Sequence, residues 1–190
     1  RLADIALATP EPRDQGIGVL DDPQRVAIEV RNLRFRYGDN EPWVLDGINF
    51  TIHPGETVAI VGPSGCGKTT LLKMLASLLA PTEGEILVDG RPLANVGLER
   101  YRSMLGVVMQ DDQLFAGSIG DNISFFSEYL DPIRIEECGR QAAVHDDIAA
   151  MPMDYNTLIG DMGTVLSGGQ KQRVLIARAL YRRPAVLLLG

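Results

Sequence analysis

Apolar and polar residues alternate along the first strongly patterned stretch of the chain. Positions 26, 28 and 30 are aliphatic, and positions 33, 35 and 37 continue the alternation with leucine, phenylalanine and tyrosine. A period of two puts alternate side chains on opposite faces of an extended chain, so this pattern predicts a half-buried strand. Gly38 to Asn40 then predicts a turn, and the apolar positions between Val44 and Ile52 predict a second strand.

Three short stretches are almost entirely apolar: 58–61, 107–109 and 184–189. Runs of this length are typical of strands that are buried on both faces, as in a parallel sheet. A further apolar run at 85–88 leads into an Asp-Gly pair, which favours a tight hairpin turn. The strands therefore divide into a hairpin-like set and a set with the composition of a buried parallel sheet.

Apolar residues recur with helical spacing in four regions: from Lys68 to about Ala80, 99–105, 118–150 and 170–183. The first 25 residues are rich in Pro, Asp and Gly, and predict a linker. The chain thus changes from β-rich to α/β, then to helical, and then to α/β again. This order predicts an α/β protein.

Composition narrows the function classes. The chain has 190 residues, 45% of them apolar, which is enough for one substantial core. A net charge of −7 and the lack of a basic stripe argue against a nucleic-acid-binding surface; Arg31, Arg34 and Arg36 alternate with apolar residues, as on the wet face of a strand. Two cysteines provide no disulfide framework, and no apolar run approaches the ~20 residues that cross a bilayer.

One motif points directly to chemistry. Residues 62–70 fit the pattern G-x-x-x-x-G-K-[ST] between a predicted strand and a predicted helix, and the expected ligands are Gly62, Pro63, Ser64, Gly65, Cys66, Gly67, Lys68, Thr69 and Thr70. Glycines allow backbone N–H groups to converge on phosphate oxygens, and the helix start adds positive potential. Lys68 supplies a cation for the β- and γ-phosphates, Thr69 a hydroxyl for Mg²⁺, and Thr70 a bond to the α-phosphate. Cys66 fills a variable position, which favours a loop role over a redox or metal role.

A second phosphate-binding pattern precedes the last long helix, at Leu166, Ser167, Gly168, Gly169 and Gln170. A hydroxyl and open N–H groups at a helix start make an anion site. Taken alone, these residues are equally consistent with a serine-capped helix that has a flexible entry.

Together with the phosphate loop and Gln110, this pattern resembles the nucleotide-binding domain of ABC (ATP-binding cassette) transporters, in which Leu166 to Gln170 match the signature motif. The resemblance covers residues 26–189. It implies that Gln110 is the Q-loop glutamine, which reaches Mg²⁺ and the attacking water, and that Tyr37 stacks on adenine. It also implies ATP and Mg²⁺ as cofactors, Lys68 and Gln110 as catalytic residues, and Thr69 and Gln110 as Mg²⁺ ligands.

The resemblance also implies an architecture and partners. The expected fold is a P-loop NTPase (RecA-like) core with an antiparallel β subdomain and an inserted α-helical subdomain at about 111–170, within an ATP-binding domain spanning 26–190 and preceded by the linker 1–25. Two copies are expected to pair head-to-tail, so that each ATP lies between one phosphate loop and the other signature helix. A transmembrane domain of the same polypeptide is the other expected partner. The ATP-binding domain is then expected at the cytoplasmic face of the bacterial inner membrane, as part of an integral membrane transporter.

Weaker matches indicate the subgroup. Residues 114–119 and 121–123 resemble the helical lobe of exporters, and 160–163 resemble the exporter X-loop, with Asp161 where Glu is usual. Residues 108–115 resemble the peptidase-containing bacteriocin exporters of the colicin V type, which export peptides with a double-glycine leader. This likeness implies that the parent protein couples ATP hydrolysis to export of such a peptide.

The end of the chain and the remaining polar residues add qualifications. Gly190 falls where the family has an Mg²⁺-binding Asp, followed by a Glu that polarises water, so the chain is expected to be C-terminally incomplete and nearly inactive by itself. Two alternatives stay open: a non-transport ABC ATPase, such as a DNA-repair or translation factor, and a nucleotide-binding module without catalysis. His145 is interpreted as a surface or capping histidine and His53 as structural, and the pairs 111–112 and 146–147 are interpreted as ordinary acidic residues.

Overall fold

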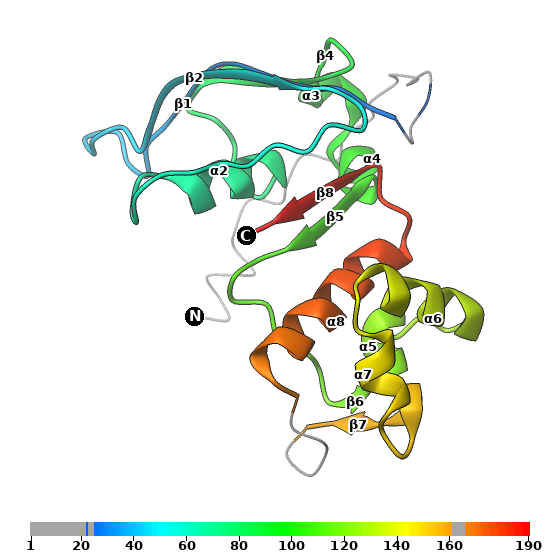
Figure 1. Ribbon diagram of the computed structural model, residues 1–190. Helices are drawn as coiled ribbons and strands as arrows, with labels where there is room; N and C mark the ends of the chain where they lie inside the picture. Colours follow the sequence, from blue (N-terminus) through cyan, green and yellow to red (C-terminus); the bar gives the residue numbers. More distant parts are fainter. Residues whose placement is uncertain (1–21, 23–24, 161–165) are drawn as a thin grey trace, which may run out of the picture.

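In the computed structural model, residues 22, 25–160 and 166–190 are described. A four-stranded antiparallel sheet forms one end of the molecule (Figure 1). Its central strands are β1 (Ile28–Phe35) and β3 (Glu83–Val88), flanked by β2 (Leu45–Ile52) and β4 (Arg91–Pro92) in the order β2-β1-β3-β4. The predicted strand pair and the predicted hairpin are therefore confirmed. Residues 89 and 90 both have positive φ, 49° and 74°, as a tight turn between twisted strands requires.

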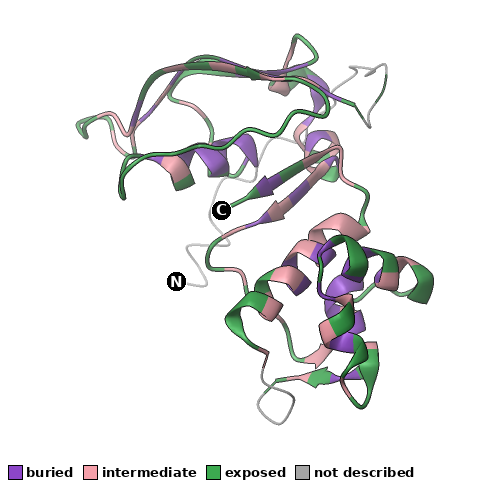
Figure 2. Ribbon diagram, viewed as in Figure 1, coloured by how far each residue is buried: buried purple, intermediate pink, exposed green. Residues whose placement is uncertain are grey.

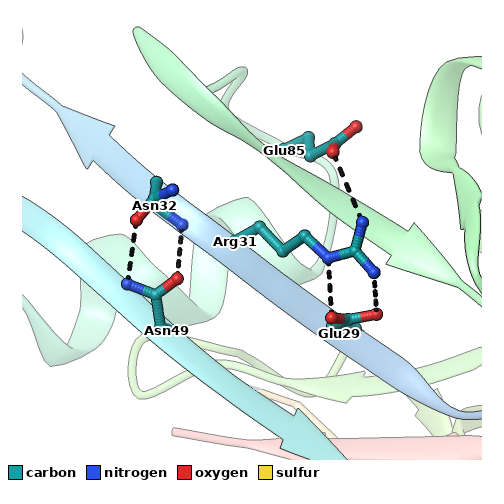
Figure 3. Close-up of polar contacts among 5 residues, drawn as sticks. All are labelled: Glu29, Arg31, Asn32, Asn49 and Glu85. Atoms are coloured by element: carbon teal, nitrogen blue, oxygen red, sulfur yellow. Dashed lines mark hydrogen bonds and ion pairs between the residues drawn. The ribbon is translucent and has the colours of Figure 1, made fainter.

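The interrupted alternation in β1 has a structural cause. The aliphatic spacing slips by one position between Val30 and Leu33, and a bulge in the pairing with β2 absorbs the extra residue. Asn32 occupies the bulge with φ 45°; its backbone N–H donates to Asn49 Oδ1 over 2.8 Å, and Asn49 Nδ2 donates to Asn32 Oδ1 over 3.2 Å (Figure 3). The bulge returns Leu33 and Phe35 to the buried face, and the amide pair links the bulged residue to β2.

The outer face of the sheet is charged. Arg31 binds both carboxylate oxygens of Glu29, over 2.6 and 2.9 Å, and approaches Glu85 of β3 at 4.0 Å (Figure 3). These exposed pairs contribute little to stability, since water screens them. They agree with the interpretation of the alternating arginines as the wet face of a strand.

Helix α2 (Lys68–Leu75) packs on the inner face of the sheet, and its residues Met74 and Leu75 are almost fully buried. The prediction that this helix continues to about Ala80 is wrong. Ser77 adopts φ 53°, and the N–H groups of Ser77 and Leu78 bond back to the carbonyls of Met74 and Lys73, which ends the helix in a left-handed cap.

Side chains from a later helix fix this end. Helix α4 (Leu98–Ser103) places the buried Tyr101 hydroxyl 2.6 Å from the Leu75 carbonyl, to which it donates, and Arg102 donates to the Ser77 carbonyl over 2.7 Å. Burial raises the pKa of Tyr101 well above its usual value, so the hydroxyl remains a donor. The end of α2 is therefore set by residues about 25 positions further along the chain.

The parallel part is a two-stranded sheet of β5 (Leu105–Val108) and β8 (Val186–Leu189). Short helix α3 (Leu93–Val96) and α4 precede it. The strands predicted at 107–109 and 184–189 are confirmed to within two residues, and the helix predicted at 99–105 corresponds to α4.

The strand predicted at Val58–Val61 is wrong. These residues form no strand, and Val58, Ile60 and Val61 are 44%, 41% and 87% exposed. A strand exists only through hydrogen bonds to a neighbour, and among the described residues no strand pairs with this segment. An apolar run by itself therefore did not suffice to form the strand.

The remaining elements form a second lobe, here called the helical lobe. It contains α5 (Ile119–Ser124), α6 (Pro132–Gln141), α7 (His145–Ala149), the 3₁₀ turn η1 (Asp154–Asn156), α8 (Gly168–Tyr181) and the short pair β6 (Gly117–Ser118) and β7 (Leu158–Ile159). Its buried side chains form a core separate from that of the sheet, so Figure 2 shows two groups of buried residues. The helical periodicity predicted for 118–150 and 170–183 is confirmed.

Helix α8 belongs to both lobes. Its apolar residues Val174 and Ala177 lie in the core of the helical lobe, while its last turn packs on β5 (Figure 1). Gly106 of β5 allows this approach, because a Cβ there would lie 2.9 Å from the Ala179 carbonyl oxygen and 2.8 Å from the Pro184 ring. The predicted architecture of an α/β core with an antiparallel sheet and a helical insertion is thus present; the domain limits 1–25, 26–190 and 111–170 stay predictions. Most of the linker falls outside the described residues.

Arg178 of α8 binds the segment that follows Gln110, through Gln113 and Asn122. Its guanidinium donates to the Asn122 carbonyl over 3.0 Å, to Asn122 Oδ1 over 2.8 Å and to the Gln113 carbonyl over 3.2 Å. It also lies over the rings of Phe115 and Phe125, at 5.3 and 5.6 Å. Burial lowers the pKa of Arg178 from its ordinary value.

We therefore expect Arg178→Ala to lower the free energy of unfolding by about 2–3 kcal/mol, because three acceptors lose a charged donor. Urea unfolding followed by far-UV circular dichroism measures this change. Arg182→Ala is the matched control, since Arg182 is exposed and lies 5.8 Å from the Phe125 ring. Equal destabilisation by the two substitutions would contradict the role assigned to Arg178.

Candidate nucleotide-binding site

The phosphate loop, residues 62–67, leads directly into α2. The Lys68 ammonium donates to the carbonyl oxygens of Gly62 and Pro63, over 2.8 and 2.7 Å, so its charge lies over the first turn of the loop. Cys66 Sγ lies 3.8 Å from the same ammonium. The loop therefore holds a fixed positive charge above a curled backbone.

Gly67 is required by its surroundings. Its φ is 94°, and a Cβ would lie 2.9 Å from the Val44 carbonyl oxygen and from Leu45 Cδ2, at the start of β2. Gly65 also has positive φ, at 81°. Alternation of left- and right-handed residues turns successive N–H groups toward one point and makes an anion-binding concavity. The structure thus gives the loop the curvature that the sequence pattern predicts.

The two threonines after Lys68 have different surroundings. Thr69 is exposed, whereas Thr70 is 7% exposed, and its hydroxyl oxygen lies 3.2 Å from that of Tyr37. The Tyr37 ring packs edge-on against Phe35, with centroids 4.9 Å apart, and is itself 60% exposed. Tyr37 therefore lies beside the phosphate loop with a ring face available to a ligand.

Trp43 lies close to the same loop, one residue before Val44. The guanidinium of Arg36 stands over the Trp43 ring at 4.8 Å, and that of Arg34 at 5.7 Å. Each pair is a cation–π contact. This indole is therefore held between β1 and the start of β2 in a defined position.

The signature segment begins α8. Ser167 Oγ accepts from the Gln170 N–H over 3.2 Å, and Gln170 Oε1 accepts from the Ser167 N–H over 3.0 Å, which forms a capping box. Gly168 and Gly169 are exposed, and a Cβ on either would meet no atom within 4 Å. Leu166 is half-buried against the core of the helical lobe. The serine cap is thus present, but nothing in the described part of the chain requires the two glycines.

Gln110 opens onto a cavity of about 360 Å³ between the ends of β5 and β8 and the first turns of α8. Gly168, Lys171 and Gly190 also line it, whereas residues 62–70 do not. Lys171 reaches across to bond the side-chain oxygen of Gln113. The structure therefore brings Gln110 to the signature helix, and brings Tyr37 to the phosphate loop, as two groups.

One link between these groups passes through Gly190. Its N–H bonds the Val108 carbonyl over 2.9 Å, and a Cβ on Gly190 would lie 3.7 Å from the Gln110 nitrogen and 2.7 Å from Leu72 Cδ2 of α2. Gly190 and Gln110 are neighbours because β5 and β8 are parallel and end at the same edge. Their proximity was therefore implicit in the predicted strands.

Other polar residues have structural partners. Asp147 accepts from Arg173 over 2.6 Å, and Asp112 accepts from the Met109 N–H over 2.9 Å. His145 Nδ1 lies 3.0 Å from the Tyr155 hydroxyl, whose pKa is raised by burial to about 12. No group of three or more His, Cys, Asp or Glu suited to a metal occurs within 25–160 and 166–190 or at residue 22. Asp161 to Gly163 of the predicted X-loop lie outside the described residues.

No helix in the described part of the chain is long and apolar enough to cross a bilayer.

Sequence reasoning did not find the contact of Tyr37 with Thr70, or Lys171 as a cavity residue. The contact joins residues that are 33 positions apart in the sequence, so no local pattern indicates it. Lys171, by contrast, directly continues the signature motif.

Comparison with known proteins places the chain in a family. The sequence profile described as ABC transporter matches residues 45–189. The probable microcin-H47 secretion/processing ATP-binding protein MchF of Escherichia coli is 47% identical over all of this chain and 27% of its own length. The colicin V secretion/processing ATP-binding protein CvaB of Escherichia coli is 44% identical with the same coverage.

A solved structure of a bacterial Atm1-family ABC exporter with ATP bound superimposes with a TM-score of 0.86 at 36% identity, over all of this chain and 33% of that one. The chain thus spans about a quarter of the length of the two secretion proteins. With a profile match over most of its residues and a shared fold, the chain belongs to the ABC transporter family and is homologous to the ATP-binding domains of its exporters.

Proposed function

We propose that this chain binds ATP with Mg²⁺ and that the intact protein hydrolyses ATP to export a bacteriocin-like peptide across the bacterial inner membrane. The main support is the pair of glycine-rich helix starts, one at the phosphate loop and one at the signature. Both have the open N–H groups and positive end that a phosphate needs. They lie in separate parts of the chain, which is the arrangement of a site completed by two copies.

The signature glycines support the second copy. Two glycines in the first turn of a helix cost about 0.5–1 kcal/mol each relative to alanine, and the neighbours of Gly168 and Gly169 leave room for side chains. Close approach of a phosphate carried by a second chain accounts for their presence. We infer a head-to-tail homodimer in which each ATP lies between one phosphate loop and the partner's signature helix.

The residues present fit a magnesium nucleotide in part. Mg²⁺ prefers oxygen ligands, and the exposed Thr69 hydroxyl and the exposed Gln110 side chain supply such oxygens. Bound Mg²⁺ would neutralise charge on the β- and γ-phosphates. Gly190, which lies next to Gln110, has no side-chain oxygen to add to these two ligands.

The positions of the remaining site residues support the roles proposed for them. Lys68 carries the positive charge that holds the terminal phosphates, and Tyr37 supplies a ring for the adenine. Gln110, whose exposed side chain opens onto the cavity beside the signature helix, is the residue proposed to orient the attacking water. In phosphoryl transfer such positioning and charge stabilisation provide most of the rate.

The proposed cargo and location rest on the relatives. The names of MchF and CvaB refer to secretion and processing of microcin H47 and colicin V, and both proteins are far longer than this chain. We infer a transmembrane domain in the same polypeptide, with the ATP-binding domain on the cytoplasmic face. The peptide cargo would contact that membrane domain. Nucleic acid is not a proposed partner, given the net charge of −7.

Reconstitution of the intact protein into liposomes tests the proposal. We expect a peptide with a double-glycine leader to enter the vesicles only with ATP and Mg²⁺, and not with a non-hydrolysable ATP analogue or with EDTA. The same peptide without its leader is the control. ATP hydrolysis without any transport, or hydrolysis stimulated by DNA or RNA, would instead support a non-transport ATPase; binding without hydrolysis would support a nucleotide-binding module.

A further inference from the structure

The hydroxyl groups of Tyr37 and Thr70 are 3.2 Å apart, within hydrogen-bond distance. The Tyr37 ring packs edge-on against Phe35, at an interplanar angle of 84°, and this contact fixes its orientation beside α2. The ring stays largely exposed, whereas Thr70 is buried. Tyr37 thus has two separate surfaces: an aromatic face open to a ligand and a hydroxyl turned toward the first turn of α2.

The Thr70 hydroxyl needs a hydrogen-bond partner, such as the Tyr37 hydroxyl, to hold its side chain in a single rotamer. In a helix, threonine divides between two side-chain rotamers, because its hydroxyl can also bond the carbonyl three or four residues earlier. For Thr70 the residue four positions back is Cys66, within the phosphate loop. The Tyr37 hydroxyl favours the rotamer that faces away from that competing carbonyl and toward Tyr37.

We propose that the Tyr37 hydroxyl is a positioning group for phosphate binding and acts through Thr70. Either oxygen can donate while no phosphate is bound. A phosphate oxygen only accepts, so a phosphate beside Thr70 fixes the direction: Tyr37 O–H donates to Thr70, and Thr70 O–H donates to the phosphate. Hydrogen bonds in such a chain strengthen one another. The inference rests on the proposed nucleotide site and adds a role distinct from stacking on the base.

The two roles of Tyr37 can be separated by the choice of ligand. Stacking acts on the adenine ring, and tripolyphosphate has no ring. A role exerted through Thr70 acts on phosphate and is therefore the same for ATP and for tripolyphosphate. Tyr37→Phe removes only the hydroxyl, while it keeps the ring and its contact with Phe35.

Calorimetric titration of the intact protein with Mg²⁺-ATP and with Mg²⁺-tripolyphosphate tests the proposal. We expect Tyr37→Phe to weaken both ligands by the same factor, about threefold to tenfold, as for loss of one hydrogen bond. Tyr37→Leu should weaken ATP further and tripolyphosphate no further. Tyr129→Phe is the matched control, because Tyr129 is 81% exposed on the helical lobe, and we expect no change.

A double-substitution cycle tests the route through Thr70. Thr70→Val removes the hydroxyl with little change of shape, and in that background Tyr37→Phe should leave the tripolyphosphate affinity unchanged. Two results would overturn the inference: weaker ATP binding by Tyr37→Phe with unaltered tripolyphosphate binding, or an equal loss in the Thr70→Val background. Failure of the unsubstituted protein to bind ATP, or ATP affinity that survives Lys68→Ala unchanged, would instead overturn the proposed site itself.

Discussion

We expect Lys68→Ala to lower the proposed ATP hydrolysis by the intact protein about a thousandfold, because the substitution removes a charge that stabilises a phosphoryl transition state. The ammonium is fixed over the phosphate loop by two carbonyl oxygens, at 2.8 and 2.7 Å. Alanine removes the cation from those carbonyls, and the attraction for the phosphates is lost with it. Release of inorganic phosphate, measured at saturating ATP and Mg²⁺, gives the effect on turnover.

Lys73→Ala is the matched control for this experiment. Lys73 lies on the same helix, is exposed, and contributes its backbone carbonyl, not its side chain, to the end of α2. We expect its turnover to stay within about twofold of the unsubstituted protein, since exposed charges remote from a site have small effects. If Lys68→Ala hydrolyses ATP at the normal rate and both variants are equally well folded, the phosphate loop is not the ATP-binding site.

Gly169→Ala should change stability and activity in opposite directions. Gly169 is the second residue of α8 and has open space around the position of a Cβ, so alanine fits and stabilises the domain by about 0.5–1 kcal/mol. The added methyl group lies on the surface proposed to approach the partner's ATP. We expect hydrolysis to fall about a hundredfold, because a misplacement of about 1 Å at a reacting site has costs of this size.

The unfolding midpoint in urea and the rate of phosphate release, measured on the same preparations, decide this prediction. Glu99→Ala, at the second position of α4, is the control for a change in the first turn of a helix, and we expect it to leave hydrolysis unchanged. If Gly169→Ala gains stability and keeps full activity, the signature helix does not face a nucleotide. Loss of both stability and activity would point to a purely structural role for the glycine.

The parts of the fold that could be predicted are those set by local sequence. The Asp-Gly turn, the serine cap of α8 and the curled loop before α2 each need only a few adjacent residues. The separation of one antiparallel sheet from a helical lobe could also be predicted, because period-two and helical patterns occupy different stretches. The candidate ligands in the phosphate loop could be named from the local motif, whereas those in the signature were named from the resemblance to the ABC family.

The errors occurred where distant residues decide the outcome. Val58–Val61 has the composition of a buried strand, but a strand also needs a neighbour, and no sequence window can supply one. The end of α2 depends on Tyr101 and Arg102, which lie about 25 residues later than the carbonyls that they bind. The approach of Tyr37 to Thr70 likewise results from packing of β1 on α2.

The position of Trp43 has a practical consequence for experiments on this protein. It is the single tryptophan of the chain, and it directly precedes Val44, whose carbonyl oxygen sets the close approach at Gly67 of the phosphate loop. Indole emission depends on nearby charges, and two guanidinium groups stand within 6 Å of this ring. The chain therefore carries an intrinsic fluorophore near its phosphate loop, and we expect its emission to report the binding of a ligand without labels.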